Sequence, residues 1–429
     1  MSTIKPFAGI RYNTTSEHDI STRLSPPYDI LDRNDKQRLL DADPINFVKI
    51  DLPHLPPKSA GPQTAYSGAR DTFDAWLADG TVVKDPQPAL YVYHQVYRHG
   101  STDYVRKMFF ARLRLEPFGE GSIFPHERTF GGPKEDRLAL TKATQTNLSP
   151  IFGLYEDTDN RVATRLEEAI ASEPTATGTF ADVENRLWAM TDPAAIADVA
   201  QMMTTKPIYI ADGHHRCGTA MLYRDWLTER QGPLPDDHPA NFVLCVFCAM
   251  EDPGLLILPT HRLLPGIRIP DGVFTADGKI ELKSLDASDP AQAIAALKNL
   301  GPQAICAYDG STQTYKALRP TAPEILDNLE PDHSRPRRRL GLAFLHAYVL
   351  DRVVTPSVSG GTAPEIRYIK SDADAIKLAQ ETDGTSFLMQ PTTMEELRAV
   401  CSAGDLMPQK STYFYPKLAS GLVVNPLTE

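Results

Sequence analysis

Apolar and polar residues alternate along the chain with two different periods, which predicts a mixture of strands and helices. Residues 89–96 and 106–115 alternate at every second position and predict two paired strands. Residues 65–77 repeat at three- and four-residue steps and predict an amphipathic helix. The apolar face of that helix holds Tyr66, Ala69, Phe73 and Trp76. We therefore expect an α/β (α+β) fold with mixed sheets.

Further elements follow from the same periods. Helices are predicted at 34–41, 133–145, 161–171, 194–203, 291–299, 340–354 and 394–403, and strands at 46–53, 150–155, 186–190, 241–250, 255–258, 304–308 and 386–390. The 429 residues suffice for two or three domains. We expect a main α/β domain at 1–265, a small α/β insertion at 266–330 and a C-terminal α/β region at 331–429 that completes the site.

The most informative stretch is PIYIADGHHRCGTAM, from Pro207 to Met221. Its first five residues predict a short buried strand, and a helical pattern begins at Cys217. The five polar or flexible residues between them form a tight turn. Such a turn presents free backbone N–H groups and the positive end of a helix dipole, where phosphate binds well.

The residue types in this turn suit an anionic ligand. Gly213 lets a ligand approach the backbone closely, and Arg216 can hold phosphate or carboxylate in a bidentate fork. Two imidazoles can transfer protons near neutral pH. We expect His215 to carry the chemistry, because it lies beside Arg216, and His214 to support the loop. The alternative is ordinary scaffolding, in which Asp212 caps the helix.

Other polar side chains gather next to the ends of predicted elements. The candidate substrate or phosphate contacts are His126, Arg128, Lys134, Arg137, His261, Arg262, Lys410, Ser411 and Lys417. If they converge on the turn, they offer cationic clamps for phosphoryl transfer, and Glu127 or Asp212 is the candidate base or Mg²⁺ ligand. The alternative is that each loop is separately solvated. The rigid loop 25–30 either borders a pocket or is a connector.

Composition narrows the function classes. The formal net charge of −11 argues against binding to nucleic acid or to a membrane surface. No apolar stretch approaches the roughly 20 residues that span a bilayer, and no signal peptide is recognisable, so we expect a cytoplasmic protein. The one basic run, RPRRR at 335–339, fits a solvated helix start.

Five cysteines do not form a disulfide framework. Cys245 and Cys248 have C-x-x-C spacing, but they lie in a predicted strand, where side chains three positions apart point to opposite faces. No second such pair completes a tetrahedral zinc site. We expect both thiols to be buried and unpaired.

Several strings together resemble the bacterial family named domain of unknown function 1015. They are SPPYDIL, PHERT, PKEDR, NLSPIFGLY, YIADGHHR, LPTHRLL and MPQKSTYFYPKL, and they run from about Lys5 to Asn425. The DGHHR turn also resembles that of the ParB/sulfiredoxin-like fold, whose members include kinases of free serine and CTP-binding partition proteins. The second resemblance covers about Pro207 to Trp226.

These resemblances imply a phosphoryl-transfer enzyme acting on a small hydroxy or phosphorylated metabolite, with serine or phosphoserine as the first guess. They leave the kinase and phosphatase directions open. The implied partners are a phosphorylated small molecule or a nucleotide, and the candidate cofactors are Mg²⁺ and nucleotide. Two alternatives remain: a ParB-like nucleotide-binding switch without metabolite turnover, and an assembly protein with structural histidines. The oligomeric state is not predicted.

Overall fold

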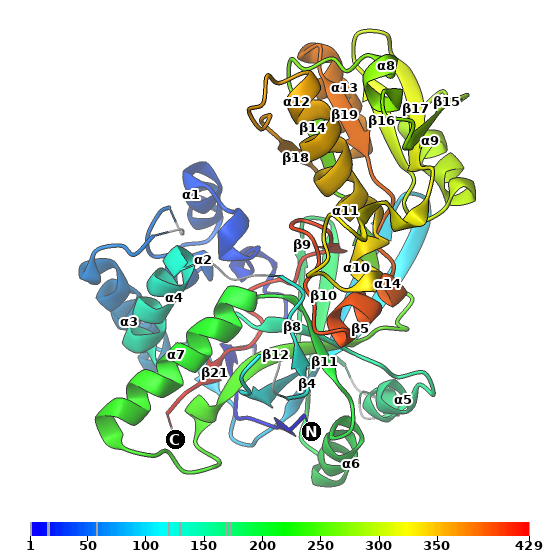
Figure 1. The fold of residues 1–429 in the computed structure, drawn as a ribbon. Helices are drawn as coiled ribbons and strands as arrows, with labels where there is room; N and C mark the ends of the chain where they lie inside the picture. Colours follow the sequence, from blue (N-terminus) through cyan, green and yellow to red (C-terminus); the bar gives the residue numbers. More distant parts are fainter. Residues whose placement is uncertain are drawn as a thin grey trace. The chain divides into compact units, whose positions relative to one another are not determined.

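The computed structural model describes residues 2–14, 18–56, 59–118, 121–127, 131–168, 170 and 173–428. The chain forms two compact units (Figure 1). The first unit consists of Met1–Leu256 together with the C-terminal segment Pro416–Glu429, and the second consists of Ile257–Tyr415. The end of the chain therefore belongs to the unit in which it began.

The first unit is built on a mixed sheet that has nine strands among the described residues. The strands, in spatial order, are β6 (Ile123–Phe124), β11 (Ile208–Asp212), β8 (Ile151–Tyr155), β12 (Phe242–Ala249), β5 (Thr102–Arg114), β4 (Leu90–His99), β10 (Val183–Met190) and β9 (Ala176–Phe180), with β1 (Ile4–Lys5) paired to β5. Strand β8 runs parallel to β12, and β6 runs parallel to β11. The pairs β12–β5, β5–β4 and β4–β10 are antiparallel. The predicted α/β class with mixed sheets is confirmed.

Helices and smaller strands complete this unit. They are η1 (Ser21–Arg23), η2 (Tyr28–Ile30), α1 (Arg33–Ala42), α2 (Val48–Asp51), α3 (Gln63–Ala78), α4 (Gly131–Thr144), α5 (Arg161–Glu168), α6 (Pro193–Met203), α7 (His214–Gln231) and η3 (Pro239–Asn241), with strand pairs β2 (Ile10–Tyr12)–β3 (Val82–Lys84) and β7 (Thr146–Asn147)–β21 (Asn425–Pro426). The predicted apolar face of α3 is confirmed, because all four of its apolar residues are buried.

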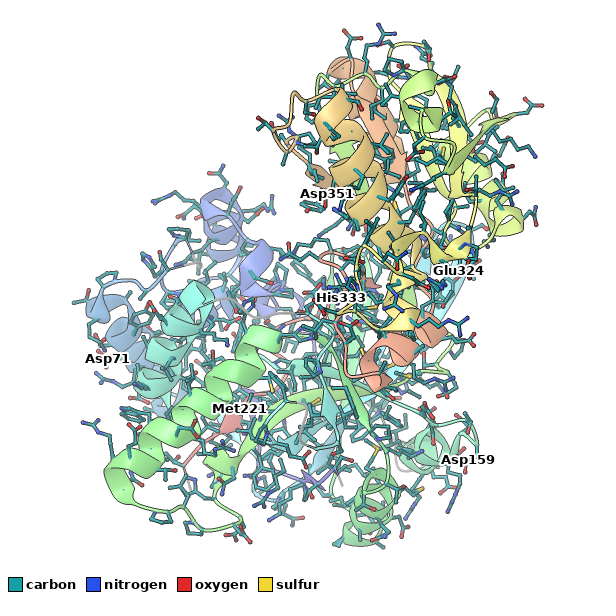
Figure 2. The ribbon with its side chains drawn as sticks, in the orientation of Figure 1. Asp71, Asp159, Met221, Glu324, His333 and Asp351 are labelled. Atoms are coloured by element: carbon teal, nitrogen blue, oxygen red, sulfur yellow. The ribbon has the colours of Figure 1, made fainter. Side chains whose placement is uncertain are left out.

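The core of the first unit explains the continuous apolar run of β12. All eight residues of this strand are buried, and Phe247 stacks on Phe109 with ring centroids 5.0 Å apart. Burying a side chain of this size contributes roughly 1.5–3 kcal/mol. Helix α7 packs on the same core through Cys217 and Ala220, with Met221 partly buried beside them (Figure 2).

The thiol prediction is confirmed, since all five cysteines are buried and free. Cys245 belongs to the apolar core. A Cβ on Gly153 would lie only 2.9 Å from Cys245 Sγ, so β8 needs glycine here to sit beside β12. The Sγ atom of Cys248 instead contacts the carbonyl of Lys107.

One predicted strand is wrong. Residues 46–53 alternate in polarity, yet residues 48–51 form helix α2. Asn46 accounts for the difference: its side-chain oxygen accepts a hydrogen bond from Val48 N–H at 2.9 Å, and its amide donates to the carbonyls of Thr22 and Leu24. Side-chain bonds of this kind compete with strand pairing.

The second unit contains an antiparallel sheet with six strands in the described part of the chain. Its strands, in spatial order, are β15 (Ile280–Leu285), β17 (Thr314–Pro320), β16 (Ile305–Asp309), β19 (Thr385–Leu388), β14 (His261–Leu264) and β18 (Arg367–Ile369), while β13 (Leu256–Leu258) pairs with β20 (Tyr413–Tyr415). Its helices are α8 (Asp271–Thr275), α9 (Pro290–Leu297), η4 (Lys298–Leu300), η5 (Pro323–Leu326), α10 (Arg335–Arg338), α11 (Gly341–Ala343), η6 (Phe344–Val354), α12 (Thr355–Ser357), α13 (Asp372–Glu381) and α14 (Met394–Ser402).

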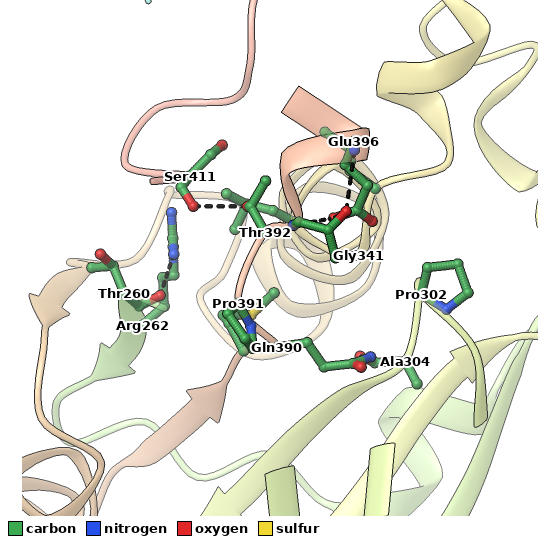
Figure 3. Close-up of a pocket in the computed structure, with 14 residues that line it drawn as sticks. Thr260, Arg262, Pro302, Ala304, Gly341, Gln390, Pro391, Thr392, Glu396 and Ser411 are labelled. Carbon is green, nitrogen blue, oxygen red and sulfur yellow. Dashed lines mark hydrogen bonds between the residues drawn. The ribbon is translucent and has the colours of Figure 1, made fainter. Parts of the chain in front are cut away.

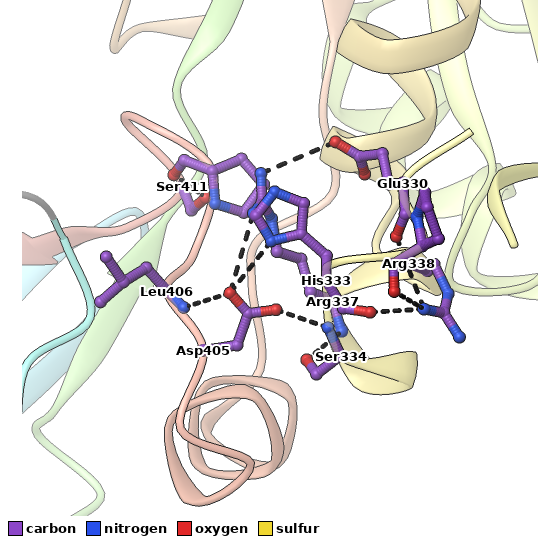
Figure 4. Close-up of polar contacts among 10 residues, drawn as sticks. Glu330, His333, Ser334, Arg337, Arg338, Asp405, Leu406 and Ser411 are labelled. Atoms are coloured by element: carbon purple, nitrogen blue, oxygen red, sulfur yellow. Dashed lines mark hydrogen bonds and ion pairs between the residues drawn. The ribbon is translucent and has the colours of Figure 1, made fainter. Parts of the chain in front are cut away.

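The basic run does start a helix, α10, but its arginines are not simply solvated (Figure 4). Arg338 and Arg339 both bind Asp327, at 2.9 and 2.8 Å. Asp405 accepts a hydrogen bond from Ser334 N–H at 2.7 Å and so holds the residue that caps α10. Arg337, Arg338 and Arg339 are therefore paired with carboxylates of their own unit.

No helix among the described residues combines the length and the apolar character that crossing a membrane requires.

Candidate anion site after strand β11

The central turn is one residue long. Strand β11 ends at Asp212, Gly213 adopts the left-handed conformation with φ of 85°, and α7 begins at His214. The helix therefore starts three residues before the predicted Cys217, because glycine reverses the backbone in a single step. Among the described residues, no side chain caps the start of α7. The alternative role of Asp212 as a helix cap is not seen, since its carboxylate accepts a hydrogen bond from Gly213 N–H instead.

Asp212 lies at the centre of a charged cluster. Its Oδ2 accepts a hydrogen bond from Lys417 Nζ at 2.6 Å, and its Oδ1 lies 3.4 Å from Arg216 Nη2. Burial alone raises the pKa of this carboxyl, but the positive charges of Lys417 and Arg216 outweigh burial, and the net pKa falls below its usual range. Asp212 is therefore ionised at neutral pH.

His126 and His214 form a buried pair. Their rings pack edge to face with centroids 4.7 Å apart. Nε2 of His214 accepts a hydrogen bond from the backbone N–H of His126 at 3.2 Å, and Nδ1 of His126 donates to the carbonyl of Ile210. Burial lowers the pKa of both imidazoles. Both rings are thus neutral and tie β11 and α7 to the loop at residue 126.

His215 has a different environment, because it is only half-buried. Burial lowers its pKa, and the positive charge of Lys134 lowers it further, against smaller opposing effects of Asp29 and Glu127. A neutral, partly accessible imidazole at a helix start can accept a proton.

Lys134 of α4 crosses the first turns of α7. Gly218 makes room for it: a Cβ at this position would lie 3.2 Å from Lys134 Nζ. The ammonium is partly buried, and it forms no hydrogen bond or ion pair with any residue that the structure describes. Among the described residues this cation has no counter-charge, and it lies beside the uncapped start of α7.

Arg216 points toward the interior of the first unit. Its Nη1 donates to the carbonyl of Pro150, and its side chain is 12% exposed. It lines a cavity of about 40 Å³ together with Tyr28, Asp51, Arg137, Ser149 and Thr219. On the same measure one water occupies roughly 10–15 Å³, so this cavity has room for a few water-sized groups.

Arg137 is fixed by carboxylates in this interior. It binds Asp136 with Nε and Nη2, at 2.9 and 2.7 Å, and its Nη1 donates to the carbonyl of Asp51. Its guanidinium also lies 3.9 Å from the centroid of the Tyr28 ring. The predicted ligand contact at Arg137 would therefore compete with a complete set of internal partners.

Asp51, Tyr28 and Ser149 were not among the predicted site residues. Ser149 Oγ donates to Asp51 Oδ2 at 2.8 Å, and burial raises the pKa of Asp51. The signal for Asp51 was hidden by the incorrect strand at 46–53. Tyr28 belongs to the rigid loop 25–30, which does border a pocket.

The remaining predicted residues lie in several places. Glu127 Oε1 is 3.8 Å from His126 Nε2, and Arg128 lies outside the described residues. His261, Arg262, Lys410 and Ser411 belong to the second unit. Both ring nitrogens of His261 are engaged there, by Asp372 at 2.7 Å and by Met389 N–H at 3.1 Å. Convergence of these residues on the turn stays a prediction.

The turn does not provide a ready Mg²⁺ site. The described residues contain no group of three or more His, Cys, Asp or Glu arranged to hold a metal ion. The oxygens of Asp212 already accept from Lys417 and Gly213 N–H.

The family model described as "Protein of unknown function (DUF1015)" matches residues 4–327. No curated protein matches the chain significantly. The solved structure "Free serine kinase in complex with AMP" shares 13% identity over 68% of this chain and 83% of that chain, with a TM-score of 0.32. "SbnI with C-terminal truncation from Staphylococcus aureus" shares 14% identity over 71% and 84%, with a TM-score of 0.34. The residues of the turn itself, rather than these distant likenesses, decide what it can bind.

Proposed function

The chain belongs to the DUF1015 family, and we propose that the β11–α7 turn is the phosphate site of a phosphoryl-transfer enzyme that acts on a small hydroxy or phosphorylated metabolite. Because the DGHHR turn resembles that of serine kinases, serine and phosphoserine are the first compounds to test. Such a site would serve a kinase, which adds a phosphoryl group to the metabolite, as well as a phosphatase, which removes one.

One observation carries this proposal: the partly buried ammonium of Lys134 lies over Gly218, beside the uncapped start of α7. The start of an 18-residue helix presents backbone donors and a positive dipole end. A phosphate there would gain both the helix donors and the charge of Lys134. It would also neutralise a cation that has no counter-charge among the described side chains.

His215 supports the chemical step. It is half-buried and its pKa is lowered, so it is neutral near pH 7 and can accept a proton. In the proposed step an acceptor hydroxyl or water attacks phosphorus and gives its proton to His215, while the bond from phosphorus to the leaving oxygen breaks. Water as the acceptor gives hydrolysis, and a metabolite hydroxyl with a nucleotide donor gives a kinase reaction.

His214 and Asp212 support the frame of the turn. His214 is buried and accepts a main-chain hydrogen bond, which suits a residue that holds the loop. Asp212 is an ionised carboxylate between two cations. That pairing fits a role in orienting Arg216 and Lys417 around the ligand better than a role as base.

The test is a screen of phosphorylated metabolites for phosphate release, with and without Mg²⁺, together with a nucleotide-plus-serine assay. A hit should lose most of its activity in Lys134→Met. Lys142→Met is the matched control, because Lys142 lies on the same helix with its ammonium over the Trp226 ring, 4.6 Å from the ring centroid.

Two outcomes would each overturn one part of the proposal, the enzymatic activity or the place of the phosphate site. The first is nucleotide binding without any turnover, which would favour the switch. The second is a hit whose activity responds equally to Lys134→Met and Lys142→Met, which would move the phosphate site elsewhere.

A further inference from the structure

The second unit contains a cavity of its own, of about 90 Å³ (Figure 3). Its wall includes Thr260, Arg262, Gly341, Gln390, Thr392 and Ser411. All of its lining residues belong to the second unit. Since one water occupies roughly 10–15 Å³ on this measure, the space suits a ligand of several non-hydrogen atoms.

Arg262 of β14 is a positively charged residue in the wall of this cavity, and it is only 1% exposed. Its Nη2 donates to the carbonyls of Gln409 and Lys410, at 2.9 Å each, and its Nη1 donates to the carbonyl of Thr260. Its guanidinium lies 5.3 Å from the centroid of the Tyr368 ring. Within the described part of the chain, Nε has no hydrogen-bond partner.

The contrast with Arg137 shows what is missing. Both arginines are buried, but Arg137 is neutralised by Asp136 and Asp51. Arg262 pairs with no carboxylate among the residues that the structure describes. Burial lowers the pKa of Arg262 to about 10, against a smaller opposing effect of Tyr368, so the group is still charged at neutral pH. A buried charge without a counter-ion is costly, and a bound anion would remove that cost.

The rest of the wall limits the kind of anion. Residues 390–393 line the cavity and lead into helix α14, so the positive end of that helix dipole lies at the cavity wall. Glu396 also lines the cavity, and its carboxylate accepts from Thr393 N–H and Oγ1 at 2.9 and 3.3 Å. In Figure 3 Glu396 and Arg262 lie on opposite sides of Thr392. The wall therefore carries one negative charge, on Glu396, as well as the positive charge of Arg262, so a monoanion fits its charge balance better than a phosphate dianion.

We propose that this cavity binds a small organic molecule with one carboxylate, which is held by the guanidinium of Arg262. The carboxylate would supply both the missing counter-charge and an acceptor for the Nε–H, which is buried without a partner among the described residues. The remainder of the ligand lies between Gln390, Thr392 and Gly341. This site uses no residue of the β11–α7 turn and does not depend on the proposed phosphoryl transfer.

Saturation-transfer NMR tests the proposal on the full chain, since it detects weak binding of small ligands. The probes are acetate and lactate, with sodium chloride at matched ionic strength and with inorganic phosphate as competitor. We expect saturation transfer to the methyl signals of one or both carboxylates. An equal concentration of phosphate should leave most of that signal.

Three variants locate the binding. Arg262→Lys keeps the charge but loses the planar fork, and we expect affinity to fall about tenfold or more. Ala304→Val narrows the cavity and leaves every contact of Arg262 in place, so it should abolish the signal. Arg319→Gln is the matched control, because Arg319 is an exposed arginine of the same unit that pairs with Glu281. It should bind like the wild type.

The proposal fails if neither carboxylate binds, or if Ala304→Val binds as tightly as the wild type. It also fails if phosphate displaces the carboxylates at equal concentration, which would make the site a phosphate site. Circular dichroism establishes that each variant is folded. If Arg262→Lys does not fold, Ala304→Val decides the matter alone.

Discussion

Lys417 donates a hydrogen bond of 2.6 Å to the carboxylate of Asp212, although 205 positions of the chain separate them. The bond joins the returning C-terminal segment to the last residue of β11. It also keeps the carboxylate beside the turn ionised, because Lys417 is the main positive charge that lowers the pKa of Asp212 against the effect of burial. Lys417 therefore controls the charge state of the candidate site from the far end of the sequence.

Replacing Lys417 should destabilise the protein. In Lys417→Met, Asp212 stays partly buried and loses its main cation, so we expect the free energy of unfolding to fall by about 1–3 kcal/mol at pH 7. The folded pKa of Asp212 lies below the unfolded value of about 3.9. The stabilisation is thus complete above that value and is lost as the pH falls through the folded pKa. Urea unfolding should therefore show a smaller difference in the free energy of unfolding between the wild type and Lys417→Met at pH 3 than at pH 7.

Lys107→Met is the control, because Lys107 pairs with Glu167 at a more exposed position. Exposed pairs contribute about 0–1 kcal/mol. Equal losses in the two variants would mean that the Asp212 pair is an ordinary surface contact.

The two adjacent histidines should separate catalysis from stability. Once a substrate is known, His215→Asn should reduce turnover by roughly 10²-fold or more, the scale of a general acid–base group, with little change in affinity. His214→Asn should act mainly on thermal stability or affinity, because its imidazole accepts the backbone N–H of His126. Turnover and melting temperature of both variants check this. Full turnover in both variants would place the chemistry elsewhere.

The buried imidazoles predict a loss of stability in mild acid. The pKa values of His126 and His214 are lowered in the folded protein. Unfolding exposes both imidazoles, and their pKa values return to about 6.5, so the unfolded chain takes up protons that the folded protein does not. Stability from this source is complete above pH 6.5 and falls as the pH drops toward the folded values, by at most about 1.4 kcal/mol per pH unit and imidazole. His214→Gln should make the decline between pH 7 and pH 5 less steep in urea unfolding. An unchanged slope would count against a neutral, buried His214.

Gly218→Ala should uncouple folding from phosphate binding. The added methyl group would lie 3.0–3.2 Å from the end of Lys134 and displace its ammonium. Alanine favours the helix over glycine by up to about 1 kcal/mol, which should offset the cost of displacing Lys134 in the free energy of unfolding. The variant should therefore fold normally, while its affinity for a phosphorylated ligand falls. Gly68→Ala is the control, since its methyl group would meet nothing within 4 Å. Equal affinities in the two variants would argue against Lys134 as a phosphate contact.

The cysteines should be inert in the native protein. All five are buried and free, and burial raises the pKa of Cys217 and Cys401 to about 12. A thiol-reactive dye should label none of them under native conditions and all five in denaturant. Rapid labelling of one thiol without denaturant would show that part of the fold opens readily.

The turn could be predicted from sequence because its signals are local. Apolar residues before Asp212, a glycine and a helical pattern lie within fifteen positions. The start of α7 was placed three residues late, since the polar residues from His214 onward hide the helical period. The error at 46–53 has a different cause. Alternation suggested a strand, but the Asn46 side chain is held by hydrogen bonds to the carbonyls of Thr22 and Leu24, more than 20 positions away in the sequence.

The partners of charged side chains could not be predicted. Lys134 and Arg137 looked equivalent in the sequence, yet Arg137 is enclosed by Asp136, Asp51 and Tyr28, whereas Lys134 lies over Gly218. Which cation is neutralised depends on the packing of α2, α3 and α4. Pairing over long separations, such as that of Lys417 with Asp212, leaves no periodic trace in the chain.

The return of Pro416–Glu429 to the first unit has a consequence for synthesis. The ribosome makes residues 1–256 early, but Lys417 and the strand that pairs with β7 leave it only after the whole second unit. Nascent chains generally fold from the N-terminus onward. A nascent first unit must therefore wait with only Arg216 paired to Asp212 while the second unit is translated. A ribosome that stalls before residue 416 leaves a chain that cannot complete its candidate site.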